Sequence, residues 1–314
     1  MDNKKTGKVK SIGNILLIII AFFGLVILGE IIVLGGQVIF YIIKGYNLEN
    51  IISKLTAIST EMSLEMTILM AVVQNIMTII VVLLFLKGKF KNRIISLSLD
   101  VKNNSLKLFL QGGFCGFIGI IFIVLIGVLI GVTKFEGFGI YSFGHGVYML
   151  FLSLITFIFV GFGEEIFFRG YIFNRLKESG GYIWSIIMSS LIFMIFHIGT
   201  YSKLLDFIDV FLAGIILVSI YIITDSLWMP IGFHFVWDFT QSFIVRIEDI
   251  PMSFSTVLNF KVPGNFYING YNFGCSFELI FILFEFLFLA LLFYKYKKIK
   301  SNIKGENNEN TIID

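Results

Sequence analysis

FLSLITFIFVGFGEEIFFRG, residues 151–170, decides the fold because it is a membrane-length apolar run that ends in three ionisable side chains. A helix needs about 20 apolar residues to cross the hydrocarbon core of a bilayer. The ionisable residues are Glu164, Glu165 and Arg169. One charge inside such a segment costs about 3 kcal/mol of insertion free energy, so such residues usually mark a functional site. The stretch therefore predicts a transmembrane helix that carries part of a site.

The whole chain has the composition of a polytopic membrane protein. Its 314 residues are 57% hydrophobic and 14% charged, and the mean hydropathy is +0.92, whereas soluble domains carry about 25% charged residues. We expect an all-α fold of about eight transmembrane helices, because eight segments are long and apolar enough to span. These segments lie near 13–43, 65–86, 108–132, 147–168, 182–200, 207–224, 228–246 and 275–294.

The distribution of basic residues predicts the orientation. Lysine and arginine are concentrated in both tails, between the second and third segments, and between the fourth and fifth. Because cytoplasmic loops carry the excess of these residues, both termini are predicted to be cytoplasmic. We divide the chain into N-terminal helices with about three spans (1–146), a helical core (147–246), and a last span with a basic cytoplasmic tail (247–314). The net charge of +3 is no nucleic-acid signature, so no nucleic-acid partner is expected.

Ionisable residues on neighbouring segments are spaced so that they can meet. Glu165 and Arg169 are four residues apart and are predicted to pair on one side of a helix, although an interfacial ion pair explains them equally well. Glu164 is rotated by about 100° from Glu165 and needs another partner. His197 lies about as far after the predicted turn at 179–180 as Glu164 lies before it. The two are therefore predicted at one depth on adjacent antiparallel helices.

The seventh segment adds His234 and Asp238, again four residues apart, so the carboxylate can orient the imidazole. The structural alternatives are a buried pair that joins helices and, for His197, a packing role. A glutamate and a histidine at one depth can deprotonate a water, and a second histidine can donate to the resulting oxyanion. The chain has no recognisable serine or cysteine nucleophile and no HExxH motif. The reaction class that fits is hydrolysis of an amide bond by water.

The order of these motifs resembles the CPBP family of CAAX-protease and bacteriocin-processing intramembrane endopeptidases, also called Abi proteins. The resemblance covers residues 147–246, and its three parts are specific only in combination. They read Glu164-Glu165-Ile-Phe-Phe-Arg169, Phe193-Met-Ile-Phe-His197 and His234-Phe-Val-Trp-Asp238. The eight-helix architecture of that family agrees with the predicted spans.

The resemblance implies an intramembrane endopeptidase. It assigns Glu164 as the general base on water and His197 as the residue that positions this water. The supporting pair would be Glu165 with Arg169, and the oxyanion site would be His234 with Asp238. Metal-free glutamate catalysis is the preferred implication, so no cofactor is expected, although two glutamates and two histidines could bind zinc.

One departure concerns the last motif, which resembles H-x-x-x-N in eukaryotic CAAX members, whereas this chain carries Asp238. An ionised aspartate cannot donate a hydrogen bond. Asp238 is therefore either protonated or serves to orient His234.

The expected partners are membrane lipid and a peptide or protein substrate at the membrane. The high isoleucine, lysine and asparagine content is typical of an AT-rich bacterial genome, so we expect a multi-pass protein of the bacterial plasma membrane. Because bacteria generally lack prenylated CAAX proteins, the expected substrate is a membrane-associated or leader-bearing peptide. Two alternatives stay open: a non-enzymatic bacteriocin-immunity or peptide-binding membrane protein, and a transporter with a proton path through Glu30, Glu164 and the histidines.

Overall fold

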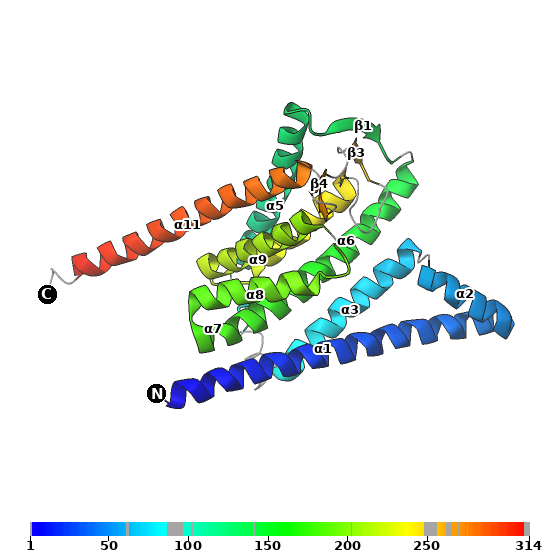
Figure 1. Ribbon diagram of the computed structural model, residues 1–314, viewed down its shortest axis with the longest axis horizontal. Helices are drawn as coiled ribbons and strands as arrows, with labels where there is room; N and C mark the ends of the chain where they lie inside the picture. The colour runs from blue at the N-terminus through cyan, green and yellow to red at the C-terminus, as the bar shows by residue number, and fades with distance from the viewer. Residues whose placement is uncertain are drawn as a thin grey trace.

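Helices make up most of the computed structural model (Figure 1). The structure describes residues 2–60, 63–86, 97–101, 103–140, 142–201, 203–247, 256–261, 266–268, 271–274 and 276–310. The helices of the N-terminal part are α1 (Asp2–Ile43), α2 (Leu48–Thr60), α3 (Leu64–Phe85) and α5 (Ser105–Leu129). The central and C-terminal helices are α6 (Phe143–Glu165), the π-helix η1 (Ile166–Phe173), α7 (Asn174–Gly180), α8 (Tyr182–Phe196), α9 (Leu204–Thr224), α10 (Trp228–Phe239), the π-helix η2 (Thr240–Ile244) and α11 (Ser276–Asn310).

The predicted all-α membrane fold is confirmed, and a helix occupies each of the eight predicted segments. Within the described residues, six helical stretches are long and apolar enough to cross a membrane. They are Ile12–Ile43, Leu64–Phe85, Ser105–Leu129, Phe143–Gly180, Leu204–Thr224 and Phe277–Lys298. Helices α8 and α10 are shorter, so the count of eight spans stays a prediction. Figure 1 shows the start of α1 and the end of α11 at the same end of the bundle, as an even number of spans requires; their cytoplasmic location also stays a prediction.

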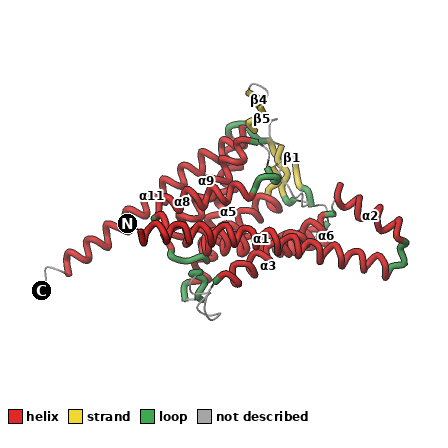
Figure 2. Tube along the Cα trace, turned by 60° about the horizontal axis from the view of Figure 1, so that its bottom comes forward, coloured by secondary structure: helices red, strands yellow, loops and turns green. Residues whose placement is uncertain are grey.

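Short strands gather at the opposite end of the molecule, as Figure 2 shows. One sheet has the order β1-β3-β2, built from β1 (Lys134–Phe138), β2 (Val245–Ile247) and β3 (Leu258–Lys261). A second pairs β4 (Phe266–Ile268) with β5 (Tyr271–Gly274). Neither the sheets nor α2 follow from the sequence pattern, because these segments are short and lack the long apolar runs that predict spans.

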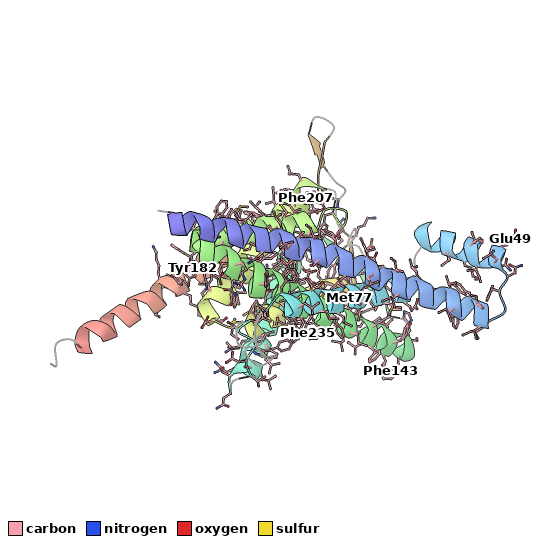
Figure 3. The ribbon with its side chains drawn as sticks, turned by 90° about the horizontal axis from the view of Figure 1, so that it is seen from below. Glu49, Met77, Phe143, Tyr182, Phe207 and Phe235 are labelled. Carbon is pink, nitrogen blue, oxygen red and sulfur yellow. The ribbon has the colours of Figure 1, made fainter. Side chains whose placement is uncertain are left out.

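The long helices present apolar side chains outward, as lipid-facing helices do. The most apolar stretch of α11 is only 17% buried, and Leu283 and Leu287 on it are each 63% exposed. In Figure 3 the side chains are crowded around the labelled Met77 and Phe235, whereas Glu49 on α2 lies far from this centre. A soluble protein rarely exposes so continuous an apolar surface, so the outer faces fit a hydrocarbon environment.

Helix α10 is held in the centre of the bundle by close contact with α5. A Cβ atom added to Gly116 of α5 would lie 2.6 Å from the Phe233 carbonyl oxygen of α10, and one added to Gly112 would overlap the Met229 carbonyl. Small residues four apart let two membrane helices approach to backbone contact. This packing fixes the position of α10, which carries His234.

Candidate active site

Glu165, the last residue of α6, is the centre of a buried polar network. Its side chain is fully buried. Its Oε1 accepts a hydrogen bond of 2.8 Å from Nη1 of Arg169 and lies 2.8 Å from Nδ1 of His234. Both distances are typical of hydrogen bonds between charged groups. The network therefore joins the end of α6 to α10.

Arg169 lies in η1 and is 2% exposed. Besides Glu165 it contacts α9, because its Nη2 donates to the Gly214 carbonyl oxygen at 3.2 Å. Its guanidinium lies 4.4 Å from the ring centroid of Phe193 on α8, a favourable cation–π geometry. The predicted Glu165–Arg169 pair thus forms, and it is a buried junction of helices rather than an ion pair at the surface.

His234 is held between carboxylates on both of its ring nitrogens. Nδ1 faces Glu165, while Nε2 lies 3.4 Å from Oδ2 of Asp238 and 3.9 Å from Oε2 of Glu164. The shorter contact is the one to Glu165, so Glu165 orients this ring more strongly than Asp238 does. Spacing along the sequence could not reveal this contact, because Glu165 and His234 lie 69 residues apart.

His197 lies directly after the last residue of α8. Its Nδ1 is 2.8 Å from the Phe193 carbonyl oxygen, and because a carbonyl only accepts, Nδ1 is the donor. In the neutral ring Nε2 is then the acceptor. The ring lies between Phe193, at 4.6 Å, and Tyr201, which is stacked at 6.1 Å with an angle of 17°. These contacts fix both the tautomer and the plane of the imidazole.

The four residues predicted to be catalytic line one cavity of about 290 Å³ inside the bundle. They are Glu164, His197, His234 and Asp238. The side chains of Glu164 and Asp238 are 23% and 25% exposed, whereas Glu165 does not line the cavity. The structure thus separates the neighbouring glutamates. Glu164 faces a space that can hold water and substrate, and Glu165 faces the helix contacts.

Several cavity residues were missed by the sequence analysis. Asn75 of α3, Tyr201, Asp209 of α9 and Glu285 of α11 all line this cavity. Burial, together with Asp238, raises the pKa of Tyr201, so its hydroxyl stays protonated. Asp209 and Glu285 are ionisable residues inside apolar segments, the same signal that singled out Glu164, and it could have found them.

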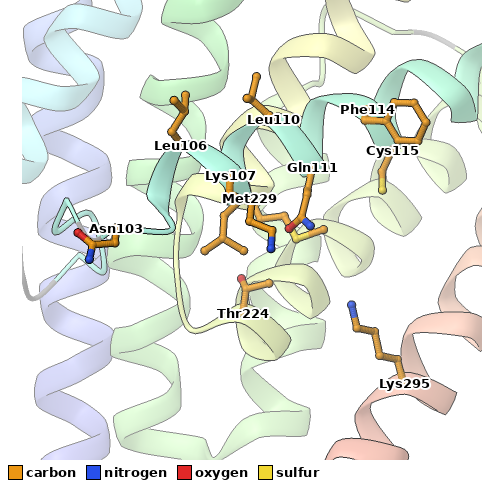
Figure 4. Close-up of a pocket in the computed structure, with 11 residues that line it drawn as sticks. Asn103, Leu106, Lys107, Leu110, Gln111, Phe114, Cys115, Thr224, Met229 and Lys295 are labelled. Atoms are coloured by element: carbon orange, nitrogen blue, oxygen red, sulfur yellow. The ribbon is translucent and has the colours of Figure 1, made fainter.

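A larger groove of about 850 Å³ lies outside this site (Figure 4). It opens between α5 and α11, and its lining includes Lys107, Cys115 and Lys295. None of the residues predicted for catalysis reaches it, so the candidate chemistry belongs to the smaller cavity.

Zinc binding was an open alternative in the sequence. Among the residues whose positions are described, no group of three histidine, cysteine, aspartate or glutamate side chains has the geometry to hold a metal ion. Glu165 and His234 are instead bonded to each other. The donor set therefore does not fit zinc in this arrangement.

The fold and site define a multi-pass α-helical membrane protein with a buried Glu–Arg–His network beside an intramembrane polar cavity. Residues 146–240 match the family model described as type II CAAX prenyl endopeptidase Rce1-like. The match contains all three motifs and confirms the resemblance to the CPBP intramembrane proteases over this segment. It supports a CAAX-type intramembrane endopeptidase in general terms. No curated protein and no solved structure matched the chain.

Proposed function

We propose that the protein is an intramembrane endopeptidase that cleaves a membrane-associated or leader-bearing peptide by glutamate-activated attack of water. The observation that carries this proposal is the shared cavity, in which Glu164 is accessible beside His197 and His234. A base, a positioning group and an oxyanion donor around one space are the parts that amide hydrolysis needs.

In the first step, Glu164 removes a proton from a water that also hydrogen-bonds to His197. The oxygen of this water attacks the scissile carbonyl carbon, and the carbonyl oxygen becomes an oxyanion. His234 donates from Nε2 to that oxyanion. Glu164 then passes its proton to the amide nitrogen, the C–N bond breaks, and the amine leaves.

His234 suits the role of donor because carboxylates face both of its nitrogens, an arrangement that favours the doubly protonated ring. Glu165 holds Nδ1 at 2.8 Å. The contacts of Nε2 to Asp238 and Glu164, at 3.4 and 3.9 Å, are longer than a strong charge-assisted bond of about 2.8 Å. Because these contacts are loose, Nε2–H can donate to an oxyanion instead. Asp238 then orients the ring rather than donating.

The test is cleavage of a peptide library by the purified protein in detergent, read by mass spectrometry. Glu164→Gln should abolish cleavage and leave the protein folded, because it removes the base and keeps the shape. Glu178→Gln is the matched control, since Glu178 pairs with Arg175 on α7, outside the cavity. Full activity in Glu164→Gln would show that the assigned base is wrong.

Two further outcomes separate the alternatives. Activity lost on chelation and restored by zinc, in protein whose metal content is measured, would support a zinc enzyme instead. Protection of cells against a bacteriocin that persists in Glu164→Gln would support a non-enzymatic immunity protein.

A further inference from the structure

Two carboxyl groups outside the three motifs, Asp209 and Glu285, lie in the wall of the active-site cavity. Asp209 is on α9 and Glu285 on α11, and the two carboxyl groups lie close enough to interact. Both line the cavity that also contains Glu164 and His197. Glu285 lies beyond the segment matched by the family model, and the hydrolytic steps proposed above use neither carboxyl group.

Each of these side chains keeps one buried oxygen without a hydrogen-bond partner among the described residues. These atoms are Oδ1 of Asp209 and Oε2 of Glu285, and Glu285 is only 1% exposed. A buried polar atom without a partner is costly. Two buried carboxyl groups with free acceptor atoms beside a cavity form a candidate binding site for a cation.

The lining of the cavity offers these carboxyl groups no lysine or arginine among the residues that the structure describes. Its ionisable side chains, among the residues that the structure describes, are four carboxyl groups, two histidines and Tyr201. Lys203, just before α9, pairs with Glu278 at 3.3 Å. Glu278 lies seven residues before Glu285, which is about 10 Å along α11. Glu285 therefore lies two helical turns further along α11 than the Lys203–Glu278 ion pair.

We propose that Asp209 and Glu285 form a subsite for a basic side chain of the peptide substrate, with lysine as the model. The ammonium group would donate to the two unpartnered oxygens. Val210, Ala213 and Leu217 of α9 line the same cavity and suit the aliphatic stem of lysine, which packs well on apolar surface. The inference rests on the proposed endopeptidase function and adds a substrate class to it: a peptide with a basic residue near the scissile bond.

The test compares two peptides that differ only in lysine or uncharged norleucine at one position near a cleavage site found in the library. Wild-type protein should cleave the lysine peptide with a kcat/KM about 10- to 100-fold higher, the range expected for a hydrogen bond to a charged group. Glu285→Gln and, separately, Asp209→Asn should bring the ratio near one. Glu278→Gln is the control that should keep the ratio, because its ion pair lies outside the cavity.

A binding measurement makes the inference independent of turnover. Fluorescent versions of both peptides are titrated onto Glu164→Gln protein, and the lysine peptide should bind about tenfold or more tightly. Equal binding and equal cleavage of the two peptides would overturn the subsite, while cleavage itself would still support the endopeptidase. A binding preference without any cleavage by wild-type protein would support the subsite and refute the proposed function.

Discussion

Substitution by glutamine should affect the two adjacent glutamates differently: it should lower the stability of the protein at Glu165 and abolish cleavage at Glu164. Glu165→Gln removes the carboxylate charge at the centre of this buried network, because Oε1 lies 2.8 Å from both Nη1 of Arg169 and Nδ1 of His234. Arg169 is 2% exposed, so water cannot replace the lost partner. Breaking a buried ion pair on one side costs about 3–5 kcal/mol. Glu165→Gln is therefore expected to destabilise the protein by about this amount.

Glu164→Gln should cost under about 1 kcal/mol of stability, because Glu164 is 23% exposed and its ion-pair contact to His234 is 3.9 Å long. Its effect on turnover should nevertheless be complete. The measurement is thermal unfolding of both variants in one detergent, beside peptide cleavage under conditions in which each is folded. Equal destabilisation by the two substitutions, or a stable Glu165→Gln protein, would refute the division of roles.

Three further predictions test the site and the packing that supports it. Asp238→Asn should keep kcat within about tenfold of wild type, because Glu165 still orients the ring, whereas His234→Ala should lower kcat by about 10²–10³; equal losses would contradict this role of Asp238. Arg169→Lys should lower the thermal midpoint, since a lysine cannot keep the contacts to Glu165 and the Gly214 carbonyl together with the stacking on Phe193. Gly116→Ala should destabilise by about 1–3 kcal/mol through overpacking against α10, while Gly144→Ala, with open space around it, should not; similar unfolding of both variants would argue against the close α5–α10 contact.

Contacts within one helix were predictable from spacing alone. The pair Glu165–Arg169 forms as its four-residue separation predicts, and so does the looser pair His234–Asp238. The apolar runs likewise predicted where helices lie, because a span needs about 20 apolar residues. Local periodicity does not show where a helix stops inside a run. Helix α8 ends at Phe196, just before a turn that contains Gly199 with φ of 99°, whereas its segment was predicted to reach residue 200.

Contacts between helices could not be predicted, because they depend on which faces meet in three dimensions. The bond from Glu165 to His234 joins α6 to α10, and the bond from Arg169 to Gly214 joins η1 to α9. Asp209 and Glu285 likewise meet at one cavity from two distant segments. Spacing along the sequence indicates none of these contacts, because the partners lie on different helices and only the fold brings them together.

The structure also explains how two identical neighbours can serve different purposes. Consecutive side chains on a helix diverge by about 100°, so at the end of α6 one glutamate points to the cavity and the next to the helix contacts. All eight residues of η1, which follows, are buried. Arg169 of η1 forms its direct ion pair with Glu165, at 2.8 Å. Glu164 has no such bond to Arg169 and keeps a buried oxygen without a hydrogen-bond partner among the described residues. In the proposed mechanism, the carboxylate of Glu164 accepts a proton from water in the cavity, while Glu165 keeps the helix end and His234 in place.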